Sequence, residues 1–125
     1  MKIAVTSSGP TLDSELDPRF GRAQYILIVD TDGLDVEAIE NPSISAGGGA
    51  GVQTSQMVAD RGAEAVLTGN CGPNAFRTLS AAGIQVYTSL SGTVRSVIQT
   101  FTEGKLTPIS DPSVPSHFGV SGSQS

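Results

Sequence analysis

The stretch 63–88, AEAVLTGNCGPNAFRTLSAAGIQVYT, decides the fold of this chain. It begins and ends with short apolar runs that have the length and composition of buried strands. Between these runs, Pro73 stands where a first helical residue is expected and Gly83 where a helix ends. Phe76 and Leu79 are three residues apart and therefore fall on one helical face. Because strands joined by a helix are normally parallel with a right-handed crossover, the stretch predicts an α/β fold.

Helical periodicity recurs on both sides of this stretch. The segment 91–104 has an apolar helical stripe formed by Val94, Val97, Ile98 and Phe101. A second helix is expected from about residue 50 to Gly62, with one face formed by Ala50, Thr54, Met57 and Val58. The chain therefore alternates strands and helices from residue 50 onward.

Three strands without intervening helices precede this alternation. We expect them at 2–6, 24–30 and 34–40, with Asp32-Gly33 as the turn between the last two. Strands joined without helices are most simply antiparallel neighbours. The whole pattern predicts a five-stranded mixed sheet in a three-layer α/β fold, with helices on both faces and a ribonuclease H-like outline.

Composition and charge narrow the classes of function. The net charge is -5 and no run of Lys or Arg occurs, so we expect no nucleic-acid partner. No apolar window approaches the roughly 18 residues of a membrane span, so we expect no membrane partner and a cytoplasmic location. The single cysteine, Cys71, excludes an internal disulfide and a zinc site of four cysteines or of two cysteines and two histidines. We expect a monomeric domain over 1–106 and a flexible Ser/Pro/Gly-rich tail over 107–125.

Five loops of unusual composition converge on one edge of the predicted sheet. If the strand at 24–30 runs opposite to the other four, its amino end and their carboxyl ends share one rim. The loops at this rim are 7–11, 17–22, 41–51, 69–73 and 89–93. Ligands of open α/β sheets bind at the carboxyl edge, and three predicted helices begin there with free N–H groups and a partial positive charge. The rim is therefore expected to attract an anion.

The segment DPRFGR, 17–22, brings two arginines to this rim. Arg19 and Arg22 would add fixed positive charge and multiple N–H donors, and Phe20 would supply an apolar wall. The alternative is that Asp17 forms exposed salt bridges with the arginines and merely fixes the turn. The shared rim favours the ligand-binding interpretation.

Cys71 lies just before the helix that begins near Pro73. A helix N-terminus favours a thiolate, which could ligate a soft metal or act as a nucleophile. The alternative is a small buried core residue. His117, the single histidine, lies in the tail, so a cysteine-histidine catalytic pair would require the tail to fold back. We expect a solvated histidine there, and metal capture by His117 is the alternative.

The glycine-rich run AGGGAG, 46–51, could hold an oxyanion or a sulfur anion with its backbone amides. It lacks the Lys-Ser/Thr ending of a P-loop and the G-x-G-x-x-G pattern, so nucleotide binding is not predicted. A ribonuclease H-type nuclease needs carboxylates on its central strands to hold two metal ions. The predicted strand at 2–6 has no acidic residue, and the one at 63–69 has only Glu64 at its entry. We therefore expect the fold of such nucleases without their chemistry.

Taken together, several motifs resemble the dinitrogenase iron-molybdenum cofactor biosynthesis family (NifX/NafY/NifB C-terminal-like). They are MKIAV, DPRFGRA, ENP, GGGAG, GNCGPNAFRTLSAAGIQVY and SGTV, which span about residues 1–106. The resemblance implies a ribonuclease H-like domain that carries or chaperones metal–sulfur clusters, among them the iron-molybdenum cofactor or its precursor. A small single-domain type of the family holds a molybdenum-copper sulfide cluster without covalent ligation.

Two positions depart from the family pattern. Many members have His where this chain has Arg19, which favours electrostatic holding of an anionic cluster over metal ligation at this position. Many members have no cysteine at the position of Cys71, so Cys71 is a candidate metal ligand peculiar to a subgroup. The predicted cofactor-binding residues are Arg19, Phe20, Gly21, Arg22, Gly48, Gly49, Gly51, Asn70, Cys71, Gly72, Ser91, Gly92 and Thr93.

The sequence thus predicts a non-enzymatic carrier of an anionic metal–sulfur cluster, of the iron-molybdenum or the molybdenum-copper type. Its partners would be the proteins that donate and accept the cluster. One alternative is an enzyme that acts on a small anion with Cys71 as nucleophile. Another is a regulatory module whose rim binds a partner protein.

Overall fold

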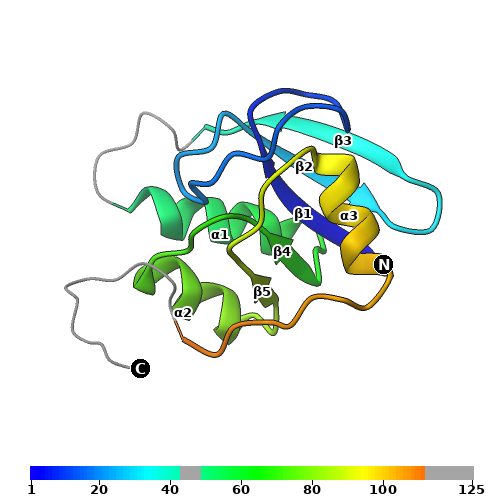
Figure 1. Ribbon diagram of the computed structural model, residues 1–125. Coiled ribbons are helices and arrows are strands. Elements are labelled where there is room, and N and C mark those ends of the chain that lie inside the picture. The colour runs from blue at the N-terminus through cyan, green and yellow to red at the C-terminus, as the bar shows by residue number, and fades with distance from the viewer. Residues whose placement is uncertain (43–48, 112–125) are drawn as a thin grey trace.

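The computed structural model describes residues 1–42 and 49–111, and it has the predicted α/β architecture (Figure 1). The strands in the described residues are β1 Lys2–Ser7, β2 Tyr25–Asp30, β3 Asp35–Glu40, β4 Ala65–Leu67 and β5 Gln85–Tyr87. The helices are α1 Ala50–Asp60, α2 Pro73–Ala81 and α3 Val94–Thr102. None of these helices is long and apolar enough to cross a membrane.

The five strands form one mixed sheet in the order β3-β2-β1-β4-β5. β2 is antiparallel to β1, with Lys2 opposite Asp30, and also antiparallel to β3. β4 is parallel to β1 and to β5. The carboxyl ends of β1, β3, β4 and β5 and the amino end of β2 therefore share one rim. The predicted strand directions are confirmed.

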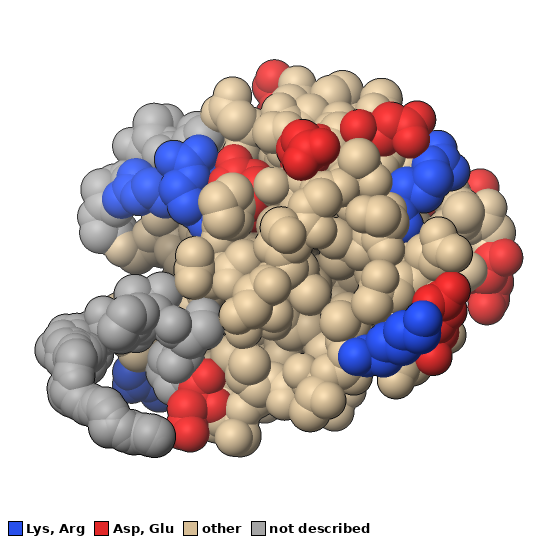
Figure 2. Space-filling view, viewed as in Figure 1, with Lys and Arg blue, Asp and Glu red and all other residues tan. Residues whose placement is uncertain are grey.

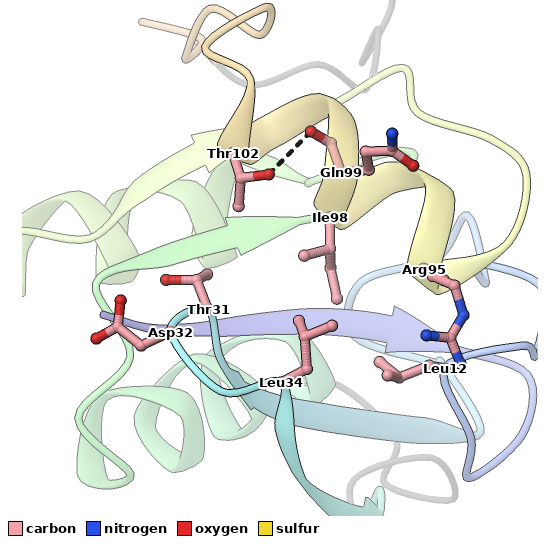
Figure 3. A pocket seen from close by; sticks show the side chains of 8 residues that line it. All are labelled: Leu12, Thr31, Asp32, Leu34, Arg95, Ile98, Gln99 and Thr102. Carbon is pink, nitrogen blue, oxygen red and sulfur yellow. Dashed lines mark hydrogen bonds between the residues drawn. The ribbon is translucent and has the colours of Figure 1, made fainter.

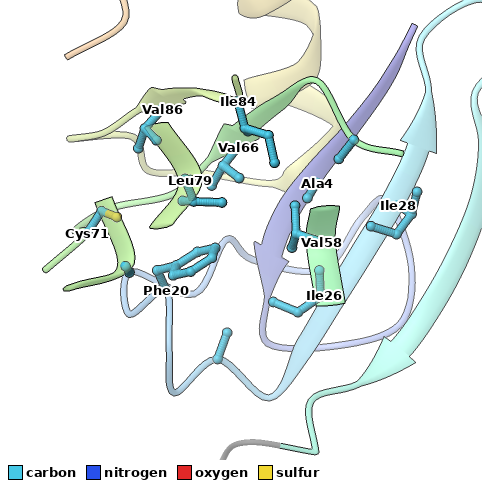
Figure 4. Packing of buried hydrophobic residues seen from close by; sticks show 13 residues of the cluster. Ala4, Phe20, Ile26, Ile28, Val58, Val66, Cys71, Leu79, Ile84 and Val86 are labelled. Carbon is cyan, nitrogen blue, oxygen red and sulfur yellow. The ribbon is translucent and has the colours of Figure 1, made fainter. Parts of the chain in front are cut away.

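Helices cover both faces of the sheet, as predicted. Successive residues of a strand point to opposite faces, and β1 shows this directly. Ala4 belongs to the buried cluster beneath α1 and α2, whereas Ile3 and Val5 belong to the cluster beneath α3 (Figures 1 and 4). The result is the expected three-layer arrangement, which is compatible with a ribonuclease H-like outline.

β3 is the exposed edge of the sheet. Five of its six residues are exposed, and only Ile39 is partly buried. The turn before it holds Leu34 in the left-handed region with φ 57°. Leu34 and Val36 remain 41% and 37% exposed, so β3 contributes little to the core.

The opposite edge, β5, is followed by a longer packed segment than the sequence predicts. The N–H of Ile109 donates to the carbonyl of Val86 at 2.8 Å, and the Ile109 side chain packs against the α1/α2-side cluster. The predicted boundary at residue 106 is therefore too early, because an apolar residue beyond it anchors the chain. His117 lies outside the described residues.

Candidate functional site

Short backbone bridges join the predicted loops at the rim. Ser7 pairs with Leu16, Glu15 with Thr93, and Arg19 with Asn70. The last pair is reinforced by Asn70 N–H donating to Pro18 O at 2.7 Å and by Phe20 N–H donating to Asn70 O at 3.3 Å. Loops 17–22 and 69–73, which are separated by some fifty residues in sequence, thus form one surface.

The carboxylate of Asp17 organises loop 17–22. It is 5% exposed and accepts hydrogen bonds from the Arg19 N–H at 3.0 Å, from Arg19 Nε and Nη2, both at 3.2 Å, and from the Gln24 N–H at 3.4 Å. The Asp17 carbonyl also accepts a 2.6 Å bond from Thr6 Oγ1 at the end of β1. A buried carboxylate with this many donors is well satisfied and fixes the loop against the sheet.

Arg19 is held by this carboxylate yet faces solvent. Its side chain is 61% exposed, and the bond to Asp17 raises the pKa of its guanidinium above the ordinary value. The ion pair that the sequence suggested as an alternative to ligand binding is therefore present. The guanidinium has five N–H donors, and the bonds to Asp17 come from Nε and Nη2. The ion pair therefore does not occupy all of the donors. Arg22, in the same loop, is also exposed.

Two helix N-termini lie side by side next to this loop. A Cβ added to Gly51, in the first turn of α1, would lie 3.1 Å from the Cβ of Ala75 in the first turn of α2. A Cβ added to Gly21 would lie 2.9 Å from Gly51 backbone atoms, so the loop contacts the start of α1 directly. Ser55 Oγ, one turn further on, donates to Ala75 O at 3.3 Å.

The three helix starts at the rim are not equivalent. Within the described residues, no side chain caps α1 at Gly49 or α2 at Gly72, and neither first turn holds an acidic residue. Thr93 caps α3, because its Oγ1 accepts a 3.1 Å bond from the N–H of Ser96. Among the described residues, the first N–H groups of α1 and α2 therefore have no side-chain cap, unlike those of α3.

Glycine at position 69 permits the close contact between the two loops. A Cβ at Gly69 would lie 2.6 Å from the Cα of Pro18 and 2.9 Å from its carbonyl oxygen. Such distances are not tolerated without backbone movement. Gly69 is thus part of the assembly of the site, although the sequence analysis did not single it out.

Two predicted site residues lie in the core instead. Phe20 is 2% exposed and packs in the α1/α2-side cluster with Ala23 and Ala75, so the predicted apolar wall for a ligand is wrong. Cys71 is fully buried in the same cluster (Figure 4). Burial raises the pKa of its thiol to about 12, which overturns the expectation of a favoured thiolate. Desolvation of the charged form outweighs the effect of the nearby helix start.

The remaining predicted residues fall into three groups. Gly92, with φ 104°, accepts a 2.8 Å bond from the N–H of Leu16, so with Thr93 it joins the 89–93 loop to the chain before Asp17. Ser91 and Asn70 are exposed at the rim. Gly48 lies outside the described residues, as do Ala46 and Gly47 of the predicted glycine-rich run 46–51.

The chemistry available at the rim is electrostatic. Within residues 1–42 and 49–111 no group of three His, Cys, Asp or Glu side chains is placed to hold a metal ion. Positive charge is present at Arg19 and Arg22, and Lys or Arg side chains are visible at this end of the molecule (Figure 2). Together with the starts of α1 and α2, which no described side chain caps, these arginines make a surface suited to an anion.

Comparison with known proteins bears on this geometry. Residues 1–104 match the family described as "Dinitrogenase iron-molybdenum cofactor". An uncharacterized protein of Methanocaldococcus jannaschii is 32% identical over 109 residues, which cover 85% of this chain and 89% of that protein.

Two solved structures are similar along most of their length. The apo form of the orange protein from Desulfovibrio gigas has a TM-score of 0.86 and 43% identity, and the match covers 89% of this chain and 94% of that one. A Thermotoga protein provisionally described as NifB has a TM-score of 0.75 and 40% identity, over 86% and 91% of the two chains.

Proposed function

This chain belongs to the dinitrogenase iron-molybdenum cofactor family, and from that premise we propose that it is a non-enzymatic carrier of an anionic metal–sulfur cluster bound at the rim. The cluster is cargo, received from one protein and passed to another during cofactor assembly. The family is one of cofactor binding and biosynthesis, which agrees with a carrier role.

One observation carries the proposal: the loop that presents the exposed guanidinium of Arg19 contacts the start of α1, which lies beside the start of α2, and neither start has a side-chain cap among the described residues. Asp17 fixes the position of Arg19, and Gly21 lets the loop touch α1 at Gly51. Positive charge held in place before binding costs little reorganisation when an anion arrives. The chain as a whole is acidic, so this local concentration of positive charge is a feature of the rim and not of the composition.

The proposed mode of binding needs no covalent ligand from the described residues. Sulfide and thiometallate anions accept hydrogen bonds from backbone N–H groups and from guanidinium N–H groups. Charge and N–H donors would then retain the cluster while leaving its metal–ligand bonds intact for transfer. The predicted cargo is an iron-molybdenum-sulfur cluster or its precursor, or a molybdenum-copper sulfide cluster.

The enzymatic alternative loses its main support. A nucleophilic cysteine must be accessible and ionised near neutral pH. Cys71 is fully buried and the pKa of its thiol is raised to about 12. The same two facts weigh against Cys71 as a metal ligand in the conformation described.

The proposal is tested by titration under anaerobic conditions. The purified protein is titrated with tetrathiomolybdate and copper, and separately with iron–sulfur species, and the visible spectrum and bound metal are measured. Stoichiometric uptake with a new charge-transfer band is expected in one of the titrations, and the metal retained identifies the cargo. Failure to take up metal in both titrations would contradict the carrier proposal.

A further inference from the structure

The end of the sheet opposite the rim has a different character. The large hydrophobic side chains that remain exposed within the described residues are Met1, Leu34 and Val36, with exposures of 46%, 41% and 37%. All three belong to one neighbourhood, because the N–H of Thr31, in the β2–β3 turn, donates to Met1 O at 2.9 Å. Exposed apolar groups that cluster in this way mark interaction surfaces.

A groove lies beside this cluster, between α3 and the β2–β3 turn. Its volume is about 450 Å³. Leu12, Leu34 and Ile98 supply its apolar lining, with Leu34 and Ile98 facing one another across it (Figure 3). Arg95 lies toward one end and Asp32 toward the other (Figure 3). The groove can therefore receive apolar side chains from a segment that passes over the turn.

β3 provides a backbone edge next to the groove. It is the outermost strand on this side, and its whole length from Asp35 to Glu40 is paired only with β2 among the described residues. Val36 and Ala38 lie opposite Val29 and Leu27, so they point to the α3 face, on the same side as the groove. An edge strand with an apolar stripe on one face is suited to accept an added strand.

The charge on this edge selects the kind of partner. Residues 30–37 contain Asp30, Asp32, Asp35 and Glu37 and no Lys or Arg. Glu37 pairs with Arg61, and Asp30 and Asp32 lie 3.7 and 3.6 Å from the amino terminus. Asp35 has no such ion pair within residues 1–42 and 49–111. Acidic side chains gather at the margin where the β2–β3 turn lies (Figures 1 and 2).

A second copy of the chain fits this edge poorly. Pairing of two β3 strands would bring the acidic side chains of both copies together, and each chain already has a net charge of -5. Like charges on paired strands are destabilising. The complementary occupant is a segment with basic side chains.

We propose that this edge, defined as β3 with the groove at Leu34 and Ile98, docks an extended partner-protein segment in which apolar and basic residues alternate. Its apolar side chains cover Leu34 and Val36 and enter the groove, while its basic side chains face Asp35 and Glu37. Main-chain hydrogen bonds to β3 supply affinity, and the alternation supplies specificity. The β2–β3 turn, Leu34 and the start of β3 lie at the opposite end of the sheet from the rim, and only the carboxyl end of β3 reaches the rim. A partner bound at 34–37 therefore leaves the rim open.

The test uses the full chain and two capped peptides. One has three Lys-Val repeats and the other has three Glu-Val repeats. Amide chemical shifts of the ¹⁵N-labelled protein are followed during titration at low salt. The Lys-Val peptide is expected to shift amides of 31–40 and of α3 and to leave 17–22 unchanged. No shift at millimolar peptide, equal binding of the Glu-Val peptide, or shifts centred on the rim would overturn the proposal.

Two variants separate the apolar contribution from the charge contribution. Leu34→Asn removes the apolar side chain at a left-handed position that Asn tolerates, so the fold is expected to persist. Asp35→Lys reverses an exposed charge. Each is expected to weaken binding of the Lys-Val peptide by about tenfold, and the effect of Asp35→Lys should shrink as salt is added. Unchanged affinity in both variants would overturn the proposal.

Two further measurements distinguish the remaining outcomes. A dimer seen in ultracentrifugation, with concentration-dependent shifts on β3, would assign the edge to a second copy and overturn the proposal. Cargo uptake by Asp35→Lys is expected to equal that of the unaltered chain. If the chain binds the Lys-Val peptide but takes up no cargo, the result supports the docking proposal and contradicts the carrier proposal alone.

Discussion

The two ends of β1 show how one sheet can carry two unlike surfaces. At the rim, loop 17–22 is fixed by the buried carboxylate of Asp17, and close backbone contacts at Gly21 and Gly69 lock it to its neighbours. At the other end, the β2–β3 turn and the start of β3 are exposed, acidic and partly apolar. The rim has rigid positive charge suited to a small anion, whereas the docking edge has open backbone suited to a protein segment.

The reactivity of a thiol should differ most between Cys71, near the rim, and a cysteine introduced at position 35 on β3. Because burial raises the pKa of Cys71 to about 12, its thiolate fraction at pH 8 is expected to be roughly a thousandfold below that of an ordinary thiol. Alkylation by iodoacetamide should be slowed at least that much, and urea should abolish the protection. The control is Asp35→Cys in a Cys71→Ala chain, which should react like a free thiol. Comparable rates at both positions would contradict the burial described for Cys71.

The raised pKa of Cys71 also gives a direction for stability against pH. A thiol whose pKa is higher in the folded than in the unfolded chain contributes stability that is fully present below its unfolded pKa, near 9. This contribution is lost as the pH rises from about 9 toward about 12. The Cys71→Ala variant should lack this part of the loss of stability above pH 9. Urea midpoints of the two proteins, measured across this pH range, make the comparison.

Glycine substitutions at the rim and in the β2–β3 turn should change the free energy of unfolding by different amounts. Gly69→Ala places a Cβ 2.6 Å from the Cα of Pro18, so the free energy of unfolding should fall by about 2 kcal/mol. Gly33→Ala, in the β2–β3 turn, brings its Cβ no closer than 3.5 Å to Asp35 Oδ2 and should change it by less than about 0.5 kcal/mol. Urea denaturation of both variants makes the comparison. Equal stability would mean that the rim loops are not locked by this contact.

Aspartate substitutions make a smaller but parallel comparison. Asp17→Asn removes a buried charged acceptor from several donors, and a loss of about 1.5 kcal/mol in the free energy of unfolding is expected. Asp35→Asn alters an exposed side chain and should have an effect within about 0.5 kcal/mol. Asp17→Asn should also weaken cargo binding, because Arg19 loses its fixed position. A stable Asp17→Asn chain with full cargo affinity would show that the carboxylate does not organise the site.

Local sequence rules predicted the elements well, for physical reasons that can be named. Pro73 and Gly83 delimit a helix because each fits a particular end, and the period of apolar residues changes from two to about 3.6 where strands give way to helices. The Asp32-Gly33 turn and the helix connections then determined the strand directions, which the sheet confirms. The convergence of loops at one rim followed from those directions.

Side-chain environments within the rim could not be derived in the same way. Whether Phe20 points outward or into the core depends on helices α1 and α2, which lie far from it in sequence. The helix-dipole argument for Cys71 was overridden by desolvation, whose extent is a property of the packed core. The contact of Gly69 with Pro18 is likewise invisible in either loop alone.

One organising residue did leave a local signal. The sequence Asp-Pro-Arg can form an Asx turn. In this turn the Asp carboxylate accepts a hydrogen bond from the backbone N–H two residues later. Asp17 does this with the N–H of Arg19 at 3.0 Å. The motif DPRFGR should therefore be interpreted as a structural carboxylate that presents an arginine.

The most direct test of the account is cargo affinity in an arginine series. Titration with thiometallate is performed on the unaltered chain, on Arg19→Ala/Arg22→Ala and on Arg61→Ala. Arg61 is a fair control because it too is a surface arginine paired with an acid, Glu37, but lies at the far end of α1. The account predicts that the double variant binds at least about tenfold more weakly, a loss of roughly 1.4 kcal/mol, while Arg61→Ala binds as the unaltered chain does. Equal cargo affinity in all three proteins would contradict the claim that the arginines of the rim hold the cluster.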